Sequence, residues 1–264
     1  MGNFGKFGLS AILISGVLLA GCSGGAGGAG TGSGAGGGTG SGGGEGSGNG
    51  GDDGGGGGDG GGGGVTPPVS TLFIATEAEA LWYENSLRPD SKAMGPLSVA
   101  GGATSLTSLP ATGQITYQGY IEILAGDGTT GANVVSPIDL SLNLAGGAMS
   151  GTADNFMGIT ADENLIQRTV SYQGAIVVSG GSLSSGTGGI AAVGFDIDGT
   201  LDSGLDSFGI DGSLVGGLYG ADGTGLRARA TSTGLDGSMV TTVNGNPGVL
   251  GVATVSAVSQ PAPP

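Results

Sequence analysis

The stretch Gly113–Ile123, GQITYQGYIEI, decides the fold of this chain because hydrophobic and polar residues alternate along it. One face carries Ile115, Tyr117, Gly119, Ile121 and Ile123, and the other carries Gln114, Thr116, Gln118, Tyr120 and Glu122. A period of two residues is typical of a β-strand with one face buried and the other in water. The stretch therefore predicts a half-buried strand.

Further segments downstream repeat this alternation or carry short apolar runs between clusters of Gly, Asp and Ser. They are Pro137–Leu144, Ala148–Ala153, Thr169–Val178, Gly189–Gly199, Ser207–Val215, Gly225–Thr231 and Gly248–Val258. Eight strands joined mostly by short turns favour an up-and-down barrel, because closure removes the exposed edges of an open sheet. Polar residues on the second face belong in water and not in lipid. The sequence thus predicts an all-β fold, an eight-stranded antiparallel soluble β-barrel over residues 111–264.

The composition excludes several kinds of chemistry. The chain has 264 residues, of which 66 are Gly, with no His and one Cys. Without His it lacks Ser-His and Cys-His dyads and the Cys/His ligand sets of zinc sites, and one Cys forms no disulfide within the chain. A net charge of -15 with six Lys plus Arg would repel a phosphate backbone. We therefore expect no cofactor and no nucleic-acid partner.

The first residues, MGNFGKFGLSAILISGVLLAGC, have the organisation of a secretory signal. Their apolar stretch, Leu9–Leu19, is too short for a membrane-spanning helix. The end of the segment, Leu19, Ala20, Gly21 and Cys22, resembles a bacterial lipobox, in which cleavage occurs before a Cys that carries a diacylglycerol. Residues 1–21 are accordingly predicted as a signal peptide, and Cys22 as the site of lipid attachment.

Residues 22–70 are predicted to form a disordered tether. Ser23 to Gly64 is almost entirely Gly with some Ala, Ser and Thr, so it has no apolar surface to bury. A flexible chain of this length spans roughly 35 Å. In the lipoproteins that the lipobox resembles, Asp after the Cys retains the protein in the inner membrane, so Ser23 favours the outer membrane.

Residues 71–110 form an N-terminal extension with one predicted helix. Thr76 and Glu79 match a capping box, and the helix is expected to end before Pro89. Trp82 and Tyr83 would either pack this helix against the core or contact a ligand. Arg88–Thr112 has Gly, Pro or Ser every few residues and is predicted as a loop.

Two segments of the barrel resemble the transferrin-binding protein B family, which also includes factor H binding protein. They are Pro110–Gly119, PATGQITYQG, and Gly212–Gly220, GSLVGGLYG, although Leu218 stands where Phe is usual. The resemblance covers roughly residues 110 to 260 and implies a surface lipoprotein with a Gly-rich anchor and a binding barrel. Only one barrel is present, without the handle domains of larger members, so transferrin binding is not implied.

The stretch Phe195–Thr200, FDIDGT, resembles the first motif of the haloacid dehalogenase superfamily. There the first Asp, here Asp196, is a phosphoryl-accepting nucleophile, and the second, here Asp198, is a general acid. That motif follows a buried parallel strand near the start of its domain, whereas here it comes late and no Lys follows Lys92. The alternation instead predicts Phe195 facing inward and both Asp residues facing water, which leaves an aspartate-based phosphatase as a remote alternative.

Acidic residues also crowd this region. They are Asp196, Asp198, Asp202, Asp206 and Asp211. Hard cations such as Ca²⁺ prefer clustered oxygen ligands, but the spacing matches no EF-hand loop and lacks its terminal Glu. These residues are weak candidates for a metal site, and the sequence favours solvated carboxylates with no metal.

The combined expectation is a non-catalytic lipoprotein of the bacterial outer membrane, anchored by acyl chains such as palmitate and displayed on the cell surface. Its barrel would bind a protein or a small solute. The alternative from another class is a structural or adhesive envelope lipoprotein without a soluble ligand.

Overall fold

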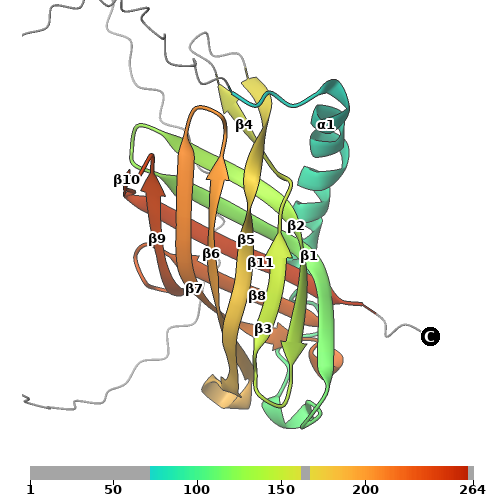
Figure 1. Ribbon diagram of the computed structural model, residues 1–264. Coiled ribbons are helices and arrows are strands. Elements are labelled where there is room, and N and C mark those ends of the chain that lie inside the picture. The colour runs from blue at the N-terminus through green and yellow to red at the C-terminus, as the bar shows by residue number, and fades with distance from the viewer. Residues whose placement is uncertain (1–71, 162–166, 261–264) are drawn as a thin grey trace, which may run out of the picture. The chain divides into compact units, whose positions relative to one another are not determined.

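The computed structural model describes residues 72–161 and 167–260 of the chain (Figure 1). The helical segments are α1 Glu77–Trp82, a π-helical turn Tyr83–Leu87, α2 Arg88–Leu97, and short 3-10 turns at Leu106–Ser108, Thr187–Gly189 and Ala221–Gly223. The strands are β1 Gln114–Gly126, β2 Gly131–Asn143, β3 Met149–Ala153, β4 Phe156–Ala161, β5 Gln167–Ser185, β6 Ala191–Asp202, β7 Ser207–Tyr219, β8 Gly225–Thr231, β9 Gly237–Val243, β10 Asn246–Pro247 and β11 Leu250–Ser259. The all-β prediction is confirmed.

The strand pairings form a closed ring, which we call the barrel. From β1 the pairings run through β2, β3, β5, β6, β7, β8 and β11, and β11 pairs with β1 again. Each step of this ring is antiparallel. These strands correspond to the segments predicted from the alternation.

The strand count nevertheless needs correction, because the sheet contains 11 strands and not eight. β3 and β4 lie one after the other beside β5, and β8 and β9 lie one after the other beside β7. The first break falls at Asp154–Asn155, where Asn155 adopts a φ of 57°. β10 is a two-residue strand that pairs with β9. Two positions of the ring are thus each filled by a broken strand.

The inner face of the barrel is apolar, as the alternation predicts. Tyr117, Ile121 and Ile123 of β1 are buried, whereas the intervening Gln118 and Glu122 are exposed. Apart from β10, every strand contributes buried residues to one hydrophobic cluster. At Gly119 a Cβ atom would collide with the backbone of Ser256 and Ala257, so β1 and β11 can approach each other only because this residue is glycine.

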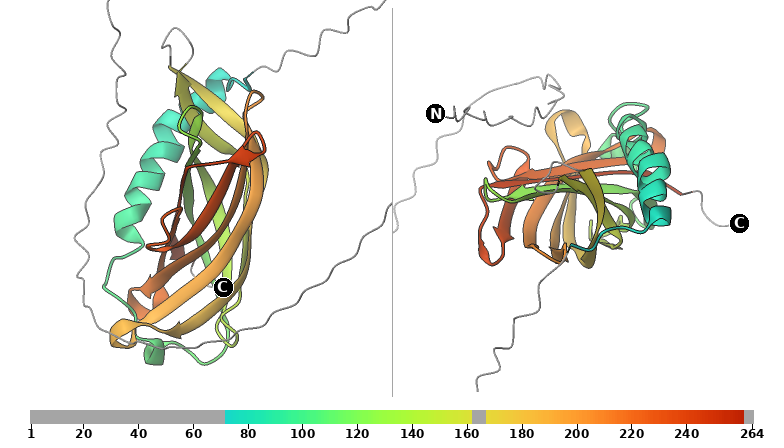
Figure 2. Two further views of the ribbon diagram at one scale, coloured as in Figure 1. Left: turned by 90° about the vertical axis from the view of Figure 1, so that its left-hand side faces the viewer. Right: turned by 90° about the horizontal axis from the view of Figure 1, so that it is seen from above.

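A helix packs on the outside of the barrel against β1, β2 and β11 (Figure 2). The predicted capping box is present, with the Glu79 amide donating to Thr76 Oγ1 and the Thr76 amide donating to the Glu79 carboxylate. The predicted end before Pro89 is wrong, because the helix continues through α2 to Leu97. Arg88–Leu97 is therefore helical and not part of a loop.

The π-helical turn explains how the helix accommodates Pro89. Its hydrogen bonds reach back five residues, and the Arg88 amide accordingly donates to the Tyr83 carbonyl. Pro89 has no N–H to donate, and it stands directly after this turn, near the start of α2, where a missing donor is tolerated. The residues that face the barrel recur at helical spacing across the proline: Ala80, Tyr83, Leu87, Ser91 and Met94.

Two segments outside the ring of strands pack at the ends of the barrel. At one end, Phe73 donates to the Ser203 carbonyl and Ala75 to the Thr169 carbonyl, while Leu72 packs against the core. At the other end, Thr104 donates to the Leu218 carbonyl and accepts from the Ala191 amide. Leu106 and Leu109 of that second segment also pack against the core. Within residues 72–161 and 167–260, no helix has the length and hydrophobicity of a membrane span.

Candidate ligand-binding surface

The stretch that resembles a phosphatase motif lies in β6, between the antiparallel neighbours β5 and β7. Phe195 points inward and is 2% exposed, whereas Asp196 and Asp198 lie on the outer face. Asp196 accepts a hydrogen bond from the Ser213 hydroxyl of β7, and Asp198 stands opposite Asp211. This geometry agrees with the facing predicted from the alternation and lacks the parallel strand that the phosphatase motif follows.

The acidic residues near β6 do not converge on one point. Along a strand Asp196 and Asp202 are separated by about 20 Å, at roughly 3.3 Å per residue. Asp202 accepts from the Gly204 amide at 2.6 Å within a turn, and Asp206 accepts at 2.9 Å from the side chain of Asn244, which is distant in sequence. In the described part of the chain, no group of three or more acidic, His or Cys side chains is placed to hold a metal ion.

The predicted lipid attachment site lies outside the described residues. Leu19, Ala20, Gly21 and Cys22 all fall before residue 72, where the description of the chain begins. Lipid attachment at Cys22 therefore stays a prediction.

The barrel interior is filled by its own side chains. Phe156, Phe208 and Tyr117 are each at most 1% exposed, and the Tyr117 hydroxyl donates to the Gly223 carbonyl at 2.8 Å. Burial raises the pKa of Tyr117 far above its ordinary value and raises that of Tyr172 to about 12. Leu72 packs against this core at one end, and Leu106 and Leu109 pack against it at the other.

The most elaborate part of the outer surface is the contact between the helix and the barrel, which we call the seam. Its apolar part consists of Tyr83 and Leu87 from the helix packed with Val135 of β2 and Met157 of β4. Its polar part includes Ser91, which donates to Glu122 of β1, and Tyr120 of β1, whose pKa is raised by burial and by the nearby Asp90 of the helix. Apolar and charged groups therefore lie side by side on one outer face.

A pocket of about 200 Å³ opens in the seam and is called the seam pocket. Its lining residues are Tyr83, Arg88, Ser91, Lys92, Glu122, Asn133, Val134, Val135 and Ile159. Burial is the main cause that raises the pKa of the Tyr83 hydroxyl; nearby Arg88 opposes this, and Glu84 and Glu122 add to it. Two of the six Lys and Arg residues of this acidic chain, Arg88 and Lys92, therefore line this pocket together with the carboxylate of Glu122.

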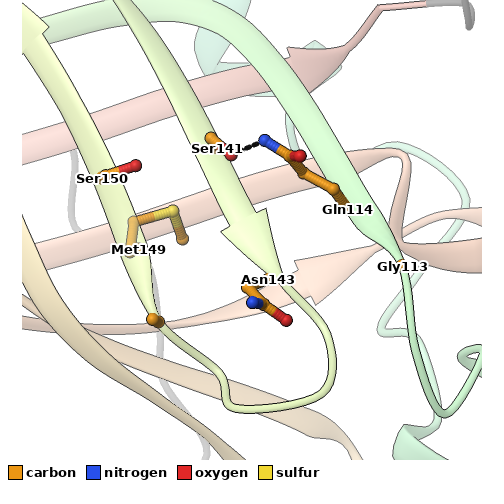
Figure 3. A pocket seen from close by; sticks show the side chains of 7 residues that line it. Gly113, Gln114, Ser141, Asn143, Met149 and Ser150 are labelled. Atoms are coloured by element: carbon orange, nitrogen blue, oxygen red, sulfur yellow. Dashed lines mark hydrogen bonds between the residues drawn. The ribbon is translucent and has the colours of Figure 1, made fainter.

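A larger hollow of about 590 Å³ lies where β1, β2 and β3 meet the closed end near Gly113 (Figure 3). Its side chains are neutral: Gln114, Ser141, Asn143 and Ser150 surround it, and the Gln114 amide donates to the Ser141 hydroxyl. The hollow is wide and open, and its lining includes no charged or aromatic side chain. The seam pocket is smaller but offers more chemistry for recognising a ligand.

Sequence reasoning did not find the seam pocket. Trp82 and Tyr83 were expected to pack the helix or to contact a ligand; Tyr83 is buried in the seam, but Trp82 is 39% exposed. The available signal was the helical spacing of Tyr83, Leu87 and Ser91, which continues past Pro89.

No family model matches the chain, and no curated protein matches it either.

Proposed function

We propose that this chain is a lipoprotein of the bacterial outer membrane, anchored through Cys22 and displayed at the cell surface. The lipobox from Leu19 to Cys22, the Ser at position 23 and the Gly-rich residues that follow support this proposal. A multiply acylated Cys is a stable anchor, because each buried CH₂ contributes about 0.8 kcal/mol.

We further propose that the barrel acts without catalysis and binds a protein or a small solute on its outer surface. The observation that carries this role is the seam pocket, where charged, hydrogen-bonding and apolar side chains converge over a filled barrel. Pockets that combine apolar walls with a few polar groups are typical ligand sites. The outward facing of Asp196 and Asp198 speaks against the phosphatase alternative. The closed ring of strands is also what the resemblance to the transferrin-binding protein B family leads one to expect.

The anchor is tested by replacing Cys22 with Ser and separating membranes in a detergent phase partition. The wild-type chain is expected in the detergent phase and the variant in the aqueous phase, with Ser23→Ala as the matched control. A variant that stays with detergent would contradict the proposed anchor.

Surface display and binding are tested on intact cells. A protease added from outside should release barrel peptides that mass spectrometry detects, and purified full chain should capture a ligand from culture medium. Release of peptides without any captured ligand would favour the structural or adhesive alternative over a binding role.

A further inference from the structure

The charges around the seam pocket are arranged by sign. Arg88 and Lys92 lie one helical turn apart on α2, and Glu122 projects from the outer face of β1. The apolar side chains of Val135 and Ile159 and the ring of Tyr83 line the same pocket. The pocket thus presents two positive groups, one negative group and an apolar wall.

The positive groups are available to a ligand. Arg88 pairs with Glu84 at 3.6 Å, but both side chains are more than 40% exposed, and exposed pairs on one helix are weak. Lys92 makes no ion pair with any residue in the described part of the chain. A ligand carboxylate can therefore replace the contact to Arg88 and gain one to Lys92 without breaking a strong interaction.

The negative group is held in place but carries no positive partner. Glu122 accepts the hydroxyl proton of Ser91, which is 5% exposed, and no ion pair joins it to a Lys or Arg of the described residues. A carboxylate oriented by a buried hydroxyl is well placed to accept hydrogen bonds from an ammonium group. An anion alone would be repelled by Glu122, and a cation alone would be repelled by Arg88 and Lys92.

We propose that the seam pocket binds a free aliphatic α-amino acid in its zwitterionic form. The carboxylate would lie at Arg88 and Lys92, the ammonium at Glu122, and the side chain against Val135 and Ile159. A volume of about 200 Å³ is below that of sites for drug-sized ligands and suits a ligand the size of one amino acid. This inference rests on the proposed binding role and gives its ligand a chemical class.

The test is calorimetric titration of the purified full chain with three probes that differ only at the charged groups. L-leucine carries both charges, N-acetyl-L-leucine lacks the ammonium, and L-leucinamide lacks the carboxylate. Only L-leucine is expected to give a saturable signal at millimolar concentration, with both derivatives weaker by roughly tenfold or more. Equal binding of all three, or no binding of leucine, would overturn the proposal.

Two variants locate the site and a third controls for net charge. Lys92→Gln and Glu122→Gln are each expected to weaken leucine binding by roughly tenfold, and Gln at position 122 still accepts from Ser91. Arg229→Gln removes an exposed positive charge that pairs with Asp236 and does not line the pocket, so binding should be unchanged. Loss of leucine binding in Arg229→Gln would refute the assignment. Unchanged leucine binding in Lys92→Gln and Glu122→Gln would refute it as well. A negative result with leucine leaves the tests of anchoring and ligand capture unaffected.

Discussion

The barrel interior and the seam are both buried contacts, but they are built differently. The interior joins apolar side chains from ten strands into one cluster, whereas the seam buries only Tyr83, Leu87, Val135 and Met157 and supplements them with polar contacts. Apolar burial contributes roughly 25 cal/mol per Å², so the larger cluster dominates the stability of the fold. The apolar interior therefore provides most of the stability of the fold, whereas the seam provides the polar and charged groups that are exposed for binding.

The tyrosines show the same contrast. Burial is the only cause that raises the pKa of Tyr117, and it is the leading cause for Tyr172, inside the barrel. In the seam, burial also raises the pKa of Tyr83 and Tyr120, but charges of the helix act on both: Arg88 lowers the pKa of Tyr83, and Asp90 raises the pKa of Tyr120 further. Burial therefore dominates the pKa shifts inside the barrel, with a smaller contribution from Asp206 at Tyr172, whereas charged residues of the helix act directly on the tyrosines of the seam.

The largest expected effect comes from emptying an interior position. Phe195→Ala removes a ring that is 2% exposed and should lower the free energy of unfolding by roughly 3 to 5 kcal/mol in urea titrations followed by circular dichroism. The adjacent change Asp196→Asn is the control and should shift it by about 0.5 kcal/mol or less. A larger loss of unfolding free energy in Asp196→Asn than in Phe195→Ala would indicate that Asp196, and not Phe195, points into the barrel.

The second-largest effect is expected at alkaline pH, which should destabilise the barrel interior. The pKa of Tyr172 is about 12 in the folded chain and about 10 when unfolded. Its raised pKa adds stability below pH 10, and that contribution is lost as pH rises through about 12, a loss of roughly 2 to 3 kcal/mol. Urea titrations across this window should show the decline, and Tyr172→Phe should reduce it. An unchanged decline in the variant would show that other groups cause it.

Removal of one apolar side chain from the seam should detach the helix from the barrel while the barrel itself stays folded. Leu87→Ala deletes a side chain that is 1% exposed and should weaken helix docking by roughly 2 kcal/mol. Amides from Tyr83 to Leu97 should then exchange with solvent about 30-fold faster, while amides of β6 and β7 keep their protection. Leu81→Ala, at a position 55% exposed, is the control. Equal acceleration in helix and strands would mean that seam and interior unfold as one unit.

The smallest expected effect concerns the outer face away from the seam. Asp198 and Asp211 stand directly opposite each other on β6 and β7, and like charges in that arrangement are destabilising. Asp211→Asn should therefore stabilise the chain by roughly 0.3 to 0.5 kcal/mol at low salt, and the gain should shrink at high salt. Asp139→Asn is the control, because its neighbours Gln118 and Thr152 are uncharged. A gain in both variants would point to net charge and not to the pair.

Sequence alternation predicted the strands whose outer face is polar, and it failed where that face carries apolar residues. In β4, the consecutive residues Phe156 and Met157 are both buried, one in the barrel and one in the seam. In β9, the outward Val240 is 65% exposed and breaks the polar face. Both strands were therefore missed.

The helix and the seam pocket depend on contacts that local rules do not contain. Pro89 argues locally for a helix end, but docking of Leu87 and Ser91 on either side of it favours continuation. Arg88 and Lys92 come close to Glu122 only because α2 lies on β1, far along the sequence. The anchor residues up to Cys22 were predicted from sequence alone and lie outside the described residues.

The short segment Leu72–Ala75 has a mechanical consequence. With the chain held at Cys22 as proposed, a load on the domain first reaches the backbone hydrogen bonds that join Phe73 and Ala75 to Ser203, Thr169 and Ser171. None of these residues before the helix belongs to the ring of strands, so they can peel away while the barrel stays closed. Once released, the chain from Leu72 to Leu97 would reach an extended length of at most about 90 Å, well beyond its folded span. Under force, the chain that links the anchor to the barrel would therefore lengthen before the strands of the barrel separate.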